Sequence, residues 1–385
     1  AMLKNKTALS LSPLALLTLA ACGGSSVASK SGKAQKGPLE NARAFIDYND
    51  NGVWDSATEP GALTDATGSY TISETLGPSA AQTAAGYSLV VTTDGLTVDT
   101  STGAVLSGVT MSAPTTSSMI TPVTTLVEEG GLTQAQVVAA LGLPATFDPM
   151  TFDAFSTTLT PAEKTTALAA EKVAQKVMAA VTTFAAVAEG SGVSAALAFE
   201  GAMSSVVAQV AVASGASTTM TVSAADVDAI STLMAAQYDA GGKFKAVVDA
   251  GSATKATYTT QATSTTDAIK NVAAAITAVT SEDLAASKDL FSVVQVMQDQ
   301  VKAAAVSTNT SGIATSVAIA TATDANGDGI ADVVATAAAN KAPTAISLSS
   351  SSLIESAASL VVGTVTTTDA DNASGHTYAI VESVG

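Results

Sequence analysis

Oxygen-bearing side chains recur at every second position in a loop that begins at residue 47. Asp, Asn, Asn and Asp occupy its positions 1, 3, 5 and 9, and a glycine at position 6 permits a sharp turn. Such spacing surrounds a hard divalent cation with oxygen ligands, and the backbone carbonyl at position 7 completes the shell. The loop therefore predicts a Ca²⁺ site of modest affinity, with a Kd on the order of 10⁻⁴ M. Its expected ligands, the last of them one place beyond the usual twelfth position, are Asp47, Asn49, Asn51, Val53, Asp55 and Glu59.

A second loop with the same spacing begins at residue 324, and it resembles the loops of dockerins and thrombospondin-type repeats. Ala335 stands at position 12, so the bidentate acid is missing, and water or a distant side chain would have to complete the shell. The expected Ca²⁺ ligands of this loop are Asp324, Asn326, Asp328, Ile330 (through its carbonyl) and Asp332.

The composition limits the other kinds of chemistry. The chain carries 33 acidic and 16 basic residues, a net charge of −17 that repels phosphate backbones, so we expect no nucleic-acid partner. It has one histidine, His376, and one cysteine, Cys22, which excludes histidine-based nucleophile systems and His/Cys zinc sites. We expect a protein that is not an enzyme.

The N-terminus indicates export. Lys4 and Lys6 precede an apolar stretch, Leu9 to Leu19, that is too short to span a membrane. The run from Leu19 to Cys22 resembles the bacterial lipobox, which implies a signal peptide over residues 1–22 and an acylated Cys22. The residue after the cysteine is glycine rather than the inner-membrane retention signal Asp, so we expect lipid anchoring to the outer membrane or cell surface.

These features lie in a chain that we expect to be an α+β multidomain protein. Gly, Ser, Lys and Ala favour a flexible tether over 23–36, and short β-rich runs between turns predict a small β-sandwich over 37–115. The segments expected to follow are a linker with one short helix (116–159), an Ala-rich antiparallel helical bundle (160–305), a β segment with the second loop (306–340) and an incomplete C-terminal β-sandwich (341–385).

Capping residues define the expected helices. Thr133 and Gln136 form a capping box, and Thr160, Pro161 and Glu163 combine an N-cap, a proline at N1 and an acid at N3. Apolar residues then recur at helical spacing up to Phe184, with no polar cluster interrupting the stripe. We therefore expect a structural core there, and no small-molecule substrate.

The first loop and the turn that follows it resemble the calcium-binding B-type repeats of Gram-positive surface adhesins and related prealbumin-like modules. The shared residues are the loop itself, Pro60 and the run Thr64 to Ile72, which matches a Thr-Asp-x-x-Gly-x-Tyr turn. The resemblance implies that Asp65 lies near the metal as a lesser ligand.

The C-terminal stretch resembles a bacterial cadherin-like repeat through Ala342-Pro343-Thr344, Glu355, Asp369-Ala370-Asp371 and Tyr378-Ala379-Ile380. The resemblance implies that Glu355, Asp369 and Asp371 help bind Ca²⁺ between repeats. Asn340-Lys341 departs from the acidic linker of animal cadherins. The repeat stops mid-pattern, so we expect a longer protein.

Together these features favour a lipid-anchored cell-surface protein with calcium-stabilised modules and a structural or adhesive role, facing protein or polysaccharide ligands. An alternative is the accessory region of a secreted hydrolase whose catalytic domain lies downstream. A third hypothesis, a small-ligand-binding lipoprotein, would be favoured by a polar-lined pocket between the helices.

Overall fold

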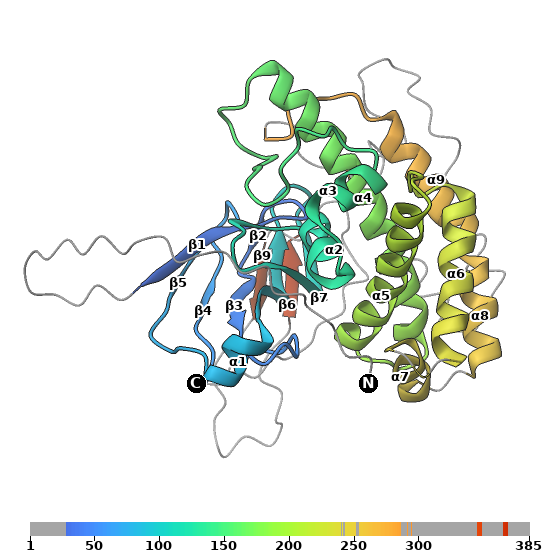
Figure 1. The fold of residues 1–385 in the computed structure, drawn as a ribbon, viewed down its shortest axis with the longest axis horizontal. Helices are drawn as coiled ribbons and strands as arrows, with labels where there is room; N and C mark the ends of the chain where they lie inside the picture. Colours follow the sequence, from blue (N-terminus) through green and yellow to red (C-terminus); the bar gives the residue numbers. More distant parts are fainter. Residues whose placement is uncertain are drawn as a thin grey trace, which may run out of the picture.

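The computed structural model describes residues 28–239, 241, 243–251, 254–285, 291, 294, 345–348 and 365–368. Within these residues the chain combines β-sheets with several helices, which confirms the predicted α+β class. The sheets lie on one side of the molecule and the helices α4 to α9 on the other, with α2 and α3 between them (Figure 1).

The β part is built from eight strands in two sheets. A three-stranded sheet has the order β5-β1-β8, and in a five-stranded sheet β6 pairs with β2, β3 and β7 while β4 extends β3. The strands are β1 (Ser29–Ala34), β2 (Leu39–Glu40), β3 (Arg43–Asp47), β4 (Gly61–Leu63), β5 (Ser69–Ser73), β6 (Ser88–Asp99), β7 (Ala104–Pro114) and β8 (Met119–Ile120).

Period-two patterning explains how these strands face the core. In β5, Tyr70 and Ile72 are buried while Thr71 and Ser73 are exposed, as expected when successive side chains point to opposite faces of a sheet. The long strands β6 and β7 form an antiparallel hairpin whose pairing runs from Ser88–Pro114 to Asp99–Ala104. The hairpin contains the two longest strands of the β part, and Asp99 is the last residue of β6.

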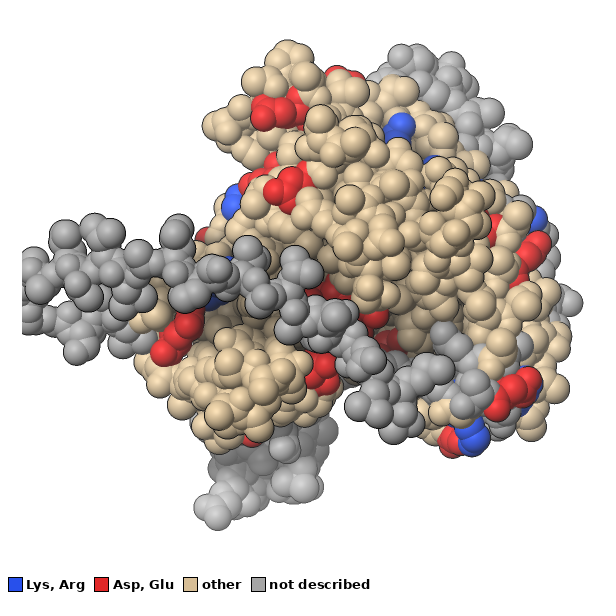
Figure 2. All heavy atoms as spheres, in the orientation of Figure 1, with Lys and Arg blue, Asp and Glu red and all other residues tan. Residues whose placement is uncertain are grey.

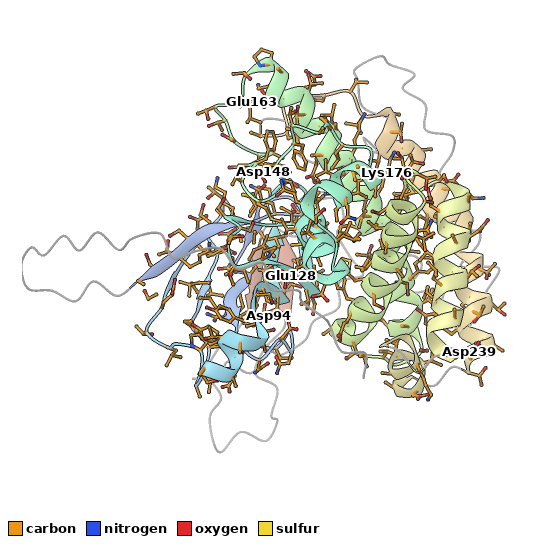
Figure 3. All side chains as sticks on the ribbon, viewed as in Figure 1. Asp94, Glu128, Asp148, Glu163, Lys176 and Asp239 are labelled. Carbon is orange, nitrogen blue, oxygen red and sulfur yellow. The ribbon has the colours of Figure 1, made fainter. Side chains whose placement is uncertain are left out.

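The described helices are α1 (Ala80–Ala85), α2 (Pro122–Gly130), α3 (Gln134–Ala140), α4 (Pro161–Gly190), α5 (Ala195–Gly215), α6 (Ala224–Asp239), α7 (Lys243–Ala250), α8 (Lys255–Ser264) and α9 (Thr266–Ala278). The predicted capping box at Thr133 and the predicted N-cap at Thr160 are confirmed, and Thr160 and Glu163 also form a capping box. At the start of α4, Glu163, labelled in Figure 3, accepts a hydrogen bond of 2.8 Å from the backbone N–H of Thr160. This pairing satisfies backbone donors that a helix start leaves without partners.

The two parts share one hydrophobic core. Strand β7 packs against both α2 and α5, and buried residues of the sheets and helices form one continuous cluster. Gly108 of β7 has a φ of +74°, and a Cβ at this position would lie 2.3 Å from the Cβ of Ala195 at the start of α5. Glycine is therefore required both for the backbone conformation and for the close approach of strand and helix.

Two segments differ from the sequence expectation. Residues 29–34 were expected to belong to a flexible tether, but they form β1. Their backbone N–H and C=O groups form hydrogen bonds with β5 and β8, which orders a segment whose Ser, Gly and Lys composition favours flexibility. The region of the expected linker contains two helices rather than one, since Thr121 forms a capping box with Thr124 and Pro122 stands at N1 of α2.

The remaining expectations concern segments that the structure describes only in part or not at all. In the C-terminal stretch, β9 (Ala345–Leu348) and β10 (Val365–Thr368) pair antiparallel. The signal peptide with Cys22, the loop from Asp324 to Asp332, and the acids Glu355, Asp369 and Asp371 lie outside the described residues.

Candidate functional site

The candidate metal loop runs from the end of β3 to the residues just before β4. Asp47 is the last residue of β3 and only 1% of it is exposed. Its carboxylate accepts hydrogen bonds from the backbone N–H groups of Asn51 (3.3 Å) and Gly52 (2.6 Å). Asp50 and Gly52 adopt positive φ angles of 56° and 72°, which fold the backbone around the carboxylate. Asp47 therefore organises the loop from the inside.

Glu59 closes the loop and is equally buried, with 1% of it exposed. Its Oε2 accepts a hydrogen bond of 2.9 Å from the backbone N–H of Asp55, whereas its Oε1 is buried without a hydrogen-bond partner. Burial raises the pKa of Glu59, and the charge of Asp47 raises it further, while backbone N–H groups of Asp55, Asn49 and Tyr48 act in the opposite direction. The loop thus encloses two carboxylates that disfavour each other's charge.

An aromatic side chain ties the closing segment to the sheet. The indole Nε1 of Trp54 donates a 3.0 Å hydrogen bond to the carbonyl of Glu59. The guanidinium of Arg43, on β3, lies 4.1 Å from the centre of the Trp54 ring, within the range of a cation–π contact. Trp54 and Arg43 thus hold the backbone of Glu59 in place.

The other predicted ligands of this loop are not gathered in the same way. Asp55 is exposed, and its oxygens accept from the backbone N–H of Ala57 and the hydroxyl of Thr58, interactions that lower its pKa. The Oδ1 of Asn51 accepts from the N–H of Val53, whose side chain is 64% exposed.

Asp65, the lesser ligand implied by resemblance, is also exposed. Its Oδ1 accepts hydrogen bonds from the backbone N–H groups of Thr67 and Ser69 within its own turn. Over the described ranges, no group of three or more His, Cys, Asp or Glu side chains lies close enough to hold a metal ion. The acids that the fold encloses in this loop are therefore Asp47 and Glu59.

A second buried charge cluster was missed by the sequence analysis. The Nζ of Lys36 lies 3.3 Å from Oδ2 of Asp99, and these side chains are 5% and 0% exposed. Helix α4 adds Glu171, 5% exposed, and Gln175, whose Nε2 donates to Glu171 Oε1 over 2.7 Å and also to the carbonyl of Lys36. The expectation that no polar cluster interrupts the apolar stripe of this helix is therefore wrong.

This cluster, Lys36–Asp99–Glu171–Gln175, joins the β part to α4. Burial raises the pKa of Glu171 to about 7; the hydrogen bond from Gln175 and the charge of Lys36 lower it, while the charge of Asp99 raises it. A second buried carboxylate beside the Lys36–Asp99 pair is thus held largely as the neutral acid below neutral pH.

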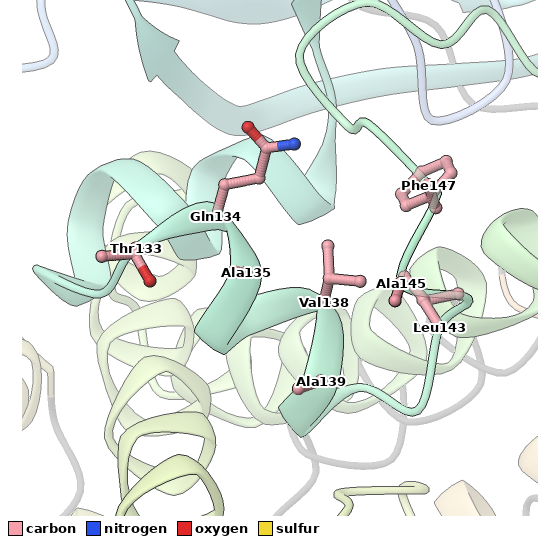
Figure 4. A pocket seen from close by; sticks show the side chains of 8 residues that line it. All are labelled: Thr133, Gln134, Ala135, Val138, Ala139, Leu143, Ala145 and Phe147. Carbon is pink, nitrogen blue, oxygen red and sulfur yellow. The ribbon is translucent and has the colours of Figure 1, made fainter.

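A cavity beside α3 and the charged side chains on one face of the protein are two further candidate surfaces. A cavity of about 370 Å³ lies between α3 and the segment that follows it, and its lining has no ionisable side chain (Figure 4): Thr133, Gln134, Ala135, Val138, Ala139, Leu143, Ala145 and Phe147. On the face in Figure 2, acidic side chains are scattered over both parts of the protein and outnumber the basic ones. Neither surface gathers a set of reactive groups.

One described helix, α5 (Ala195–Gly215), is long and apolar enough to cross a membrane. Half of the most apolar stretch of this helix is buried inside the protein, where the helix packs against α4, α6 and β7.

Comparison of the chain with protein-family models, curated proteins and solved structures found no match.

Proposed function

We propose that this chain is a non-enzymatic, lipid-anchored cell-surface protein whose β part is stabilised by a calcium ion in the loop from Asp47 to Glu59. The observation that carries the calcium proposal is a pair of buried carboxylates, one of which has an oxygen with no hydrogen-bond partner. The lipid anchor rests on the lipobox that ends at Cys22, and a structural or adhesive role rests on the order of the segments along the chain.

Electrostatics supports a bound cation. A buried carboxylate is expensive unless a cation or several hydrogen-bond donors compensate it, and two in one loop repel each other. Asp47 accepts from two N–H groups of its own loop. Glu59 accepts from the N–H of Asp55 through Oε2, and the N–H groups of Asn49 and Tyr48 also favour its charge, but its Oε1 is buried without a hydrogen-bond partner. A cation between them would compensate both charges and use the free oxygen.

The donor set favours calcium among the common cations. Carboxylate, amide and backbone carbonyl oxygens in a glycine-bent loop are ligands for a hard ion, and Ca²⁺ tolerates irregular geometry better than Mg²⁺. Asp55 and the amides would need side-chain rotation to join, which their exposure permits. Extracellular modules bind Ca²⁺ with a Kd of about 10⁻⁴ to 10⁻³ M, a range that the ion concentration outside a cell can fill.

Direct titration tests the proposal. The chain has one tryptophan, Trp54, whose indole bonds to Glu59, so its fluorescence reports on the loop. We expect saturable Ca²⁺ binding by calorimetry with a matching fluorescence change. Asp47→Asn and Glu59→Gln should each weaken binding about tenfold or more, as expected for losing a charged ligand.

Asp94→Asn is the matched control, because Asp94 is an exposed acid of the same sheet whose Oδ1 accepts from the backbone N–H of Leu96, outside the loop. Its charge also acts on Arg43, which contacts Trp54, so this control is compared by calorimetry rather than by fluorescence. This variant should bind Ca²⁺ like the wild type. Absence of saturable binding in the wild-type protein, or equal weakening by all three substitutions, would overturn the calcium proposal.

A further inference from the structure

A second cavity lies among the helices, and polar and basic side chains line it. It has a volume of about 340 Å³ and is bounded by α4, α9 and the turn before α6. Lys176 of α4 and Lys270 of α9 line it, together with Thr221, Ser223 and Thr277. Figure 3 labels Lys176 in the part of the helical layer where α4 and α9 pack together.

Basic residues are scarce in this chain, with 16 against 33 acids, so their clustering here is informative. Lys172 lies one helical turn before Lys176, and its Nζ donates a 2.9 Å hydrogen bond to the carbonyl of Thr277, a residue of the cavity wall. Its positive charge reaches Lys176, because it lowers the pKa of that lysine, although burial is the larger cause. Three lysines thus lie in or beside one cavity.

Lys176 makes no hydrogen bond or ion pair with any residue that the structure describes, although it is partly buried. Two acids of α4 and α6 are engaged with other groups of the protein. Glu171 is bonded to Gln175, and Oδ2 of Asp226 accepts from the backbone N–H groups of Thr221 and Ser223. A partly desolvated ammonium group beside other cations is stabilised when an anion supplies the missing charge.

The turn before α6 holds its part of the wall in a fixed shape. Val222, which also lines the cavity, is 3% exposed and has a positive φ of 56°. A β-branched residue rarely adopts this conformation, so the surrounding packing and the Asp226 bonds must maintain it. The hydroxyl groups of Thr221 and Ser223 are therefore held on either side of a rigid residue.

We infer that this cavity binds a small oxyanion, such as a molecule bearing a carboxylate, phosphate or sulfate group, with Lys176 as its main cationic contact. Lysine ammonium groups pair with such anions as point charges, and the hydroxyl of Thr221 adds a hydrogen-bond donor. The hydroxyls of Ser223 and Thr277 donate instead to Asp226 and to the carbonyl of Ala273. The volume lies at the lower end of small-molecule sites, which are about 300–1,000 Å³. The inference is independent of the calcium loop and departs from the expectation that the helices bind no small molecule.

Calorimetric titration of the whole chain with inorganic phosphate, sulfate and succinate tests the inference. The buffer contains about 0.15 M salt to screen non-specific attraction. It is treated to remove divalent ions, with no chelator, because EDTA is itself a polycarboxylate. We expect saturable binding of one ion per chain for at least one probe, and the order of affinities separates tetrahedral oxyanions from carboxylates.

Three variants identify the contact. Lys176→Gln should weaken binding about tenfold or more, equal to about 1.4 kcal/mol. Lys176→Arg should restore most of it. Lys245→Gln removes the same charge from an exposed lysine paired with Asp249 and should leave binding unchanged. Binding of none of the three probes, or equal weakening by Lys176→Gln and Lys245→Gln at unchanged melting temperature, would overturn the inference.

Discussion

Two buried acid clusters among the described residues differ in what compensates their negative charge. In the Lys36–Asp99–Glu171–Gln175 cluster the chain supplies its own cation, Lys36. Burial raises the pKa of Glu171 to about 7, so this second carboxyl group is largely uncharged below that pH. In the loop from Asp47 to Glu59, two carboxylates are buried and the described residues place no cation against them. The first cluster is therefore stabilised by the chain alone, whereas we expect the second to need an ion from solution.

Removing the internal cation should have the largest effect on stability. Lys36→Met leaves Asp99 and Glu171 buried without a positive charge, and breaking a buried pair in this way costs about 3–5 kcal/mol. Urea unfolding measures the loss.

Lys33→Met is the matched control for this substitution. Lys33 forms a 2.6 Å ion pair with Asp153, but the two side chains are 34% and 20% exposed. A partly exposed pair of this kind contributes about 1 kcal/mol or less. If the Lys36 variant lost no more stability than the Lys33 variant, the internal-cation account of the cluster would be wrong.

The pH dependence of stability should come next in size. The pKa of Glu171 rises from 4.5 to about 7 on folding, so the folded state holds this proton more tightly than the unfolded chain. The stabilisation is fully present below pH 4.5 and is lost as the pH rises through 7, a loss on the order of 2–3 kcal/mol between pH 5 and 8. Unfolding free energies at the two pH values measure it.

Glu171→Gln isolates this contribution, since Gln cannot titrate and other groups remain as they are. Glu59 shares the sign of the shift, because its pKa is also raised, so the comparison is made between the wild type and the Glu171 variant under one set of conditions. The variant should show a flatter pH dependence. An unchanged slope would show that Glu171 is already ionised in the folded protein.

The smallest expected effect is that of an Asp55 substitution on Ca²⁺ binding. Asp55 was predicted as a ligand, but its oxygens accept from Ala57 and Thr58 at an exposed turn. Asp55→Asn should therefore weaken Ca²⁺ binding less than Asp47→Asn does, by about threefold or less against tenfold. Calorimetry on the two variants decides it, and equal losses would place Asp55 in the coordination shell.

Local signals in the sequence predicted much of this architecture. The capping boxes at Thr133 and Thr160 involve residues three positions apart, so sequence spacing alone reveals them. The spacing of the loop identified Asp47 as a candidate ligand, but its burial was not predicted. Thr121 and Pro122 carry the same kind of signal for α2, but the residue at N3 is a threonine rather than an acid. The sequence analysis therefore did not predict this helix.

Contacts between distant residues could not be predicted in this way. Lys36 and Asp99 are 63 residues apart, and Gln175 reaches Lys36 across 139 residues. No periodicity in one sequence reveals that such residues meet. The strand β1 escaped notice for the same reason, because its hydrogen bonds come from β5 and β8, far along the chain.

Thermal unfolding of the wild type and of Glu59→Gln, with and without calcium, tests whether an ion stabilises the loop from Asp47 to Glu59. With Ca²⁺ at about 100 times its Kd, binding should stabilise the folded state by about 2.7 kcal/mol, which raises the melting temperature by roughly 3–5 °C. The Glu59 variant should lose most of this rise, and Glu171→Gln should retain it. A melting temperature of the wild type that is the same in calcium and in EDTA would contradict the account.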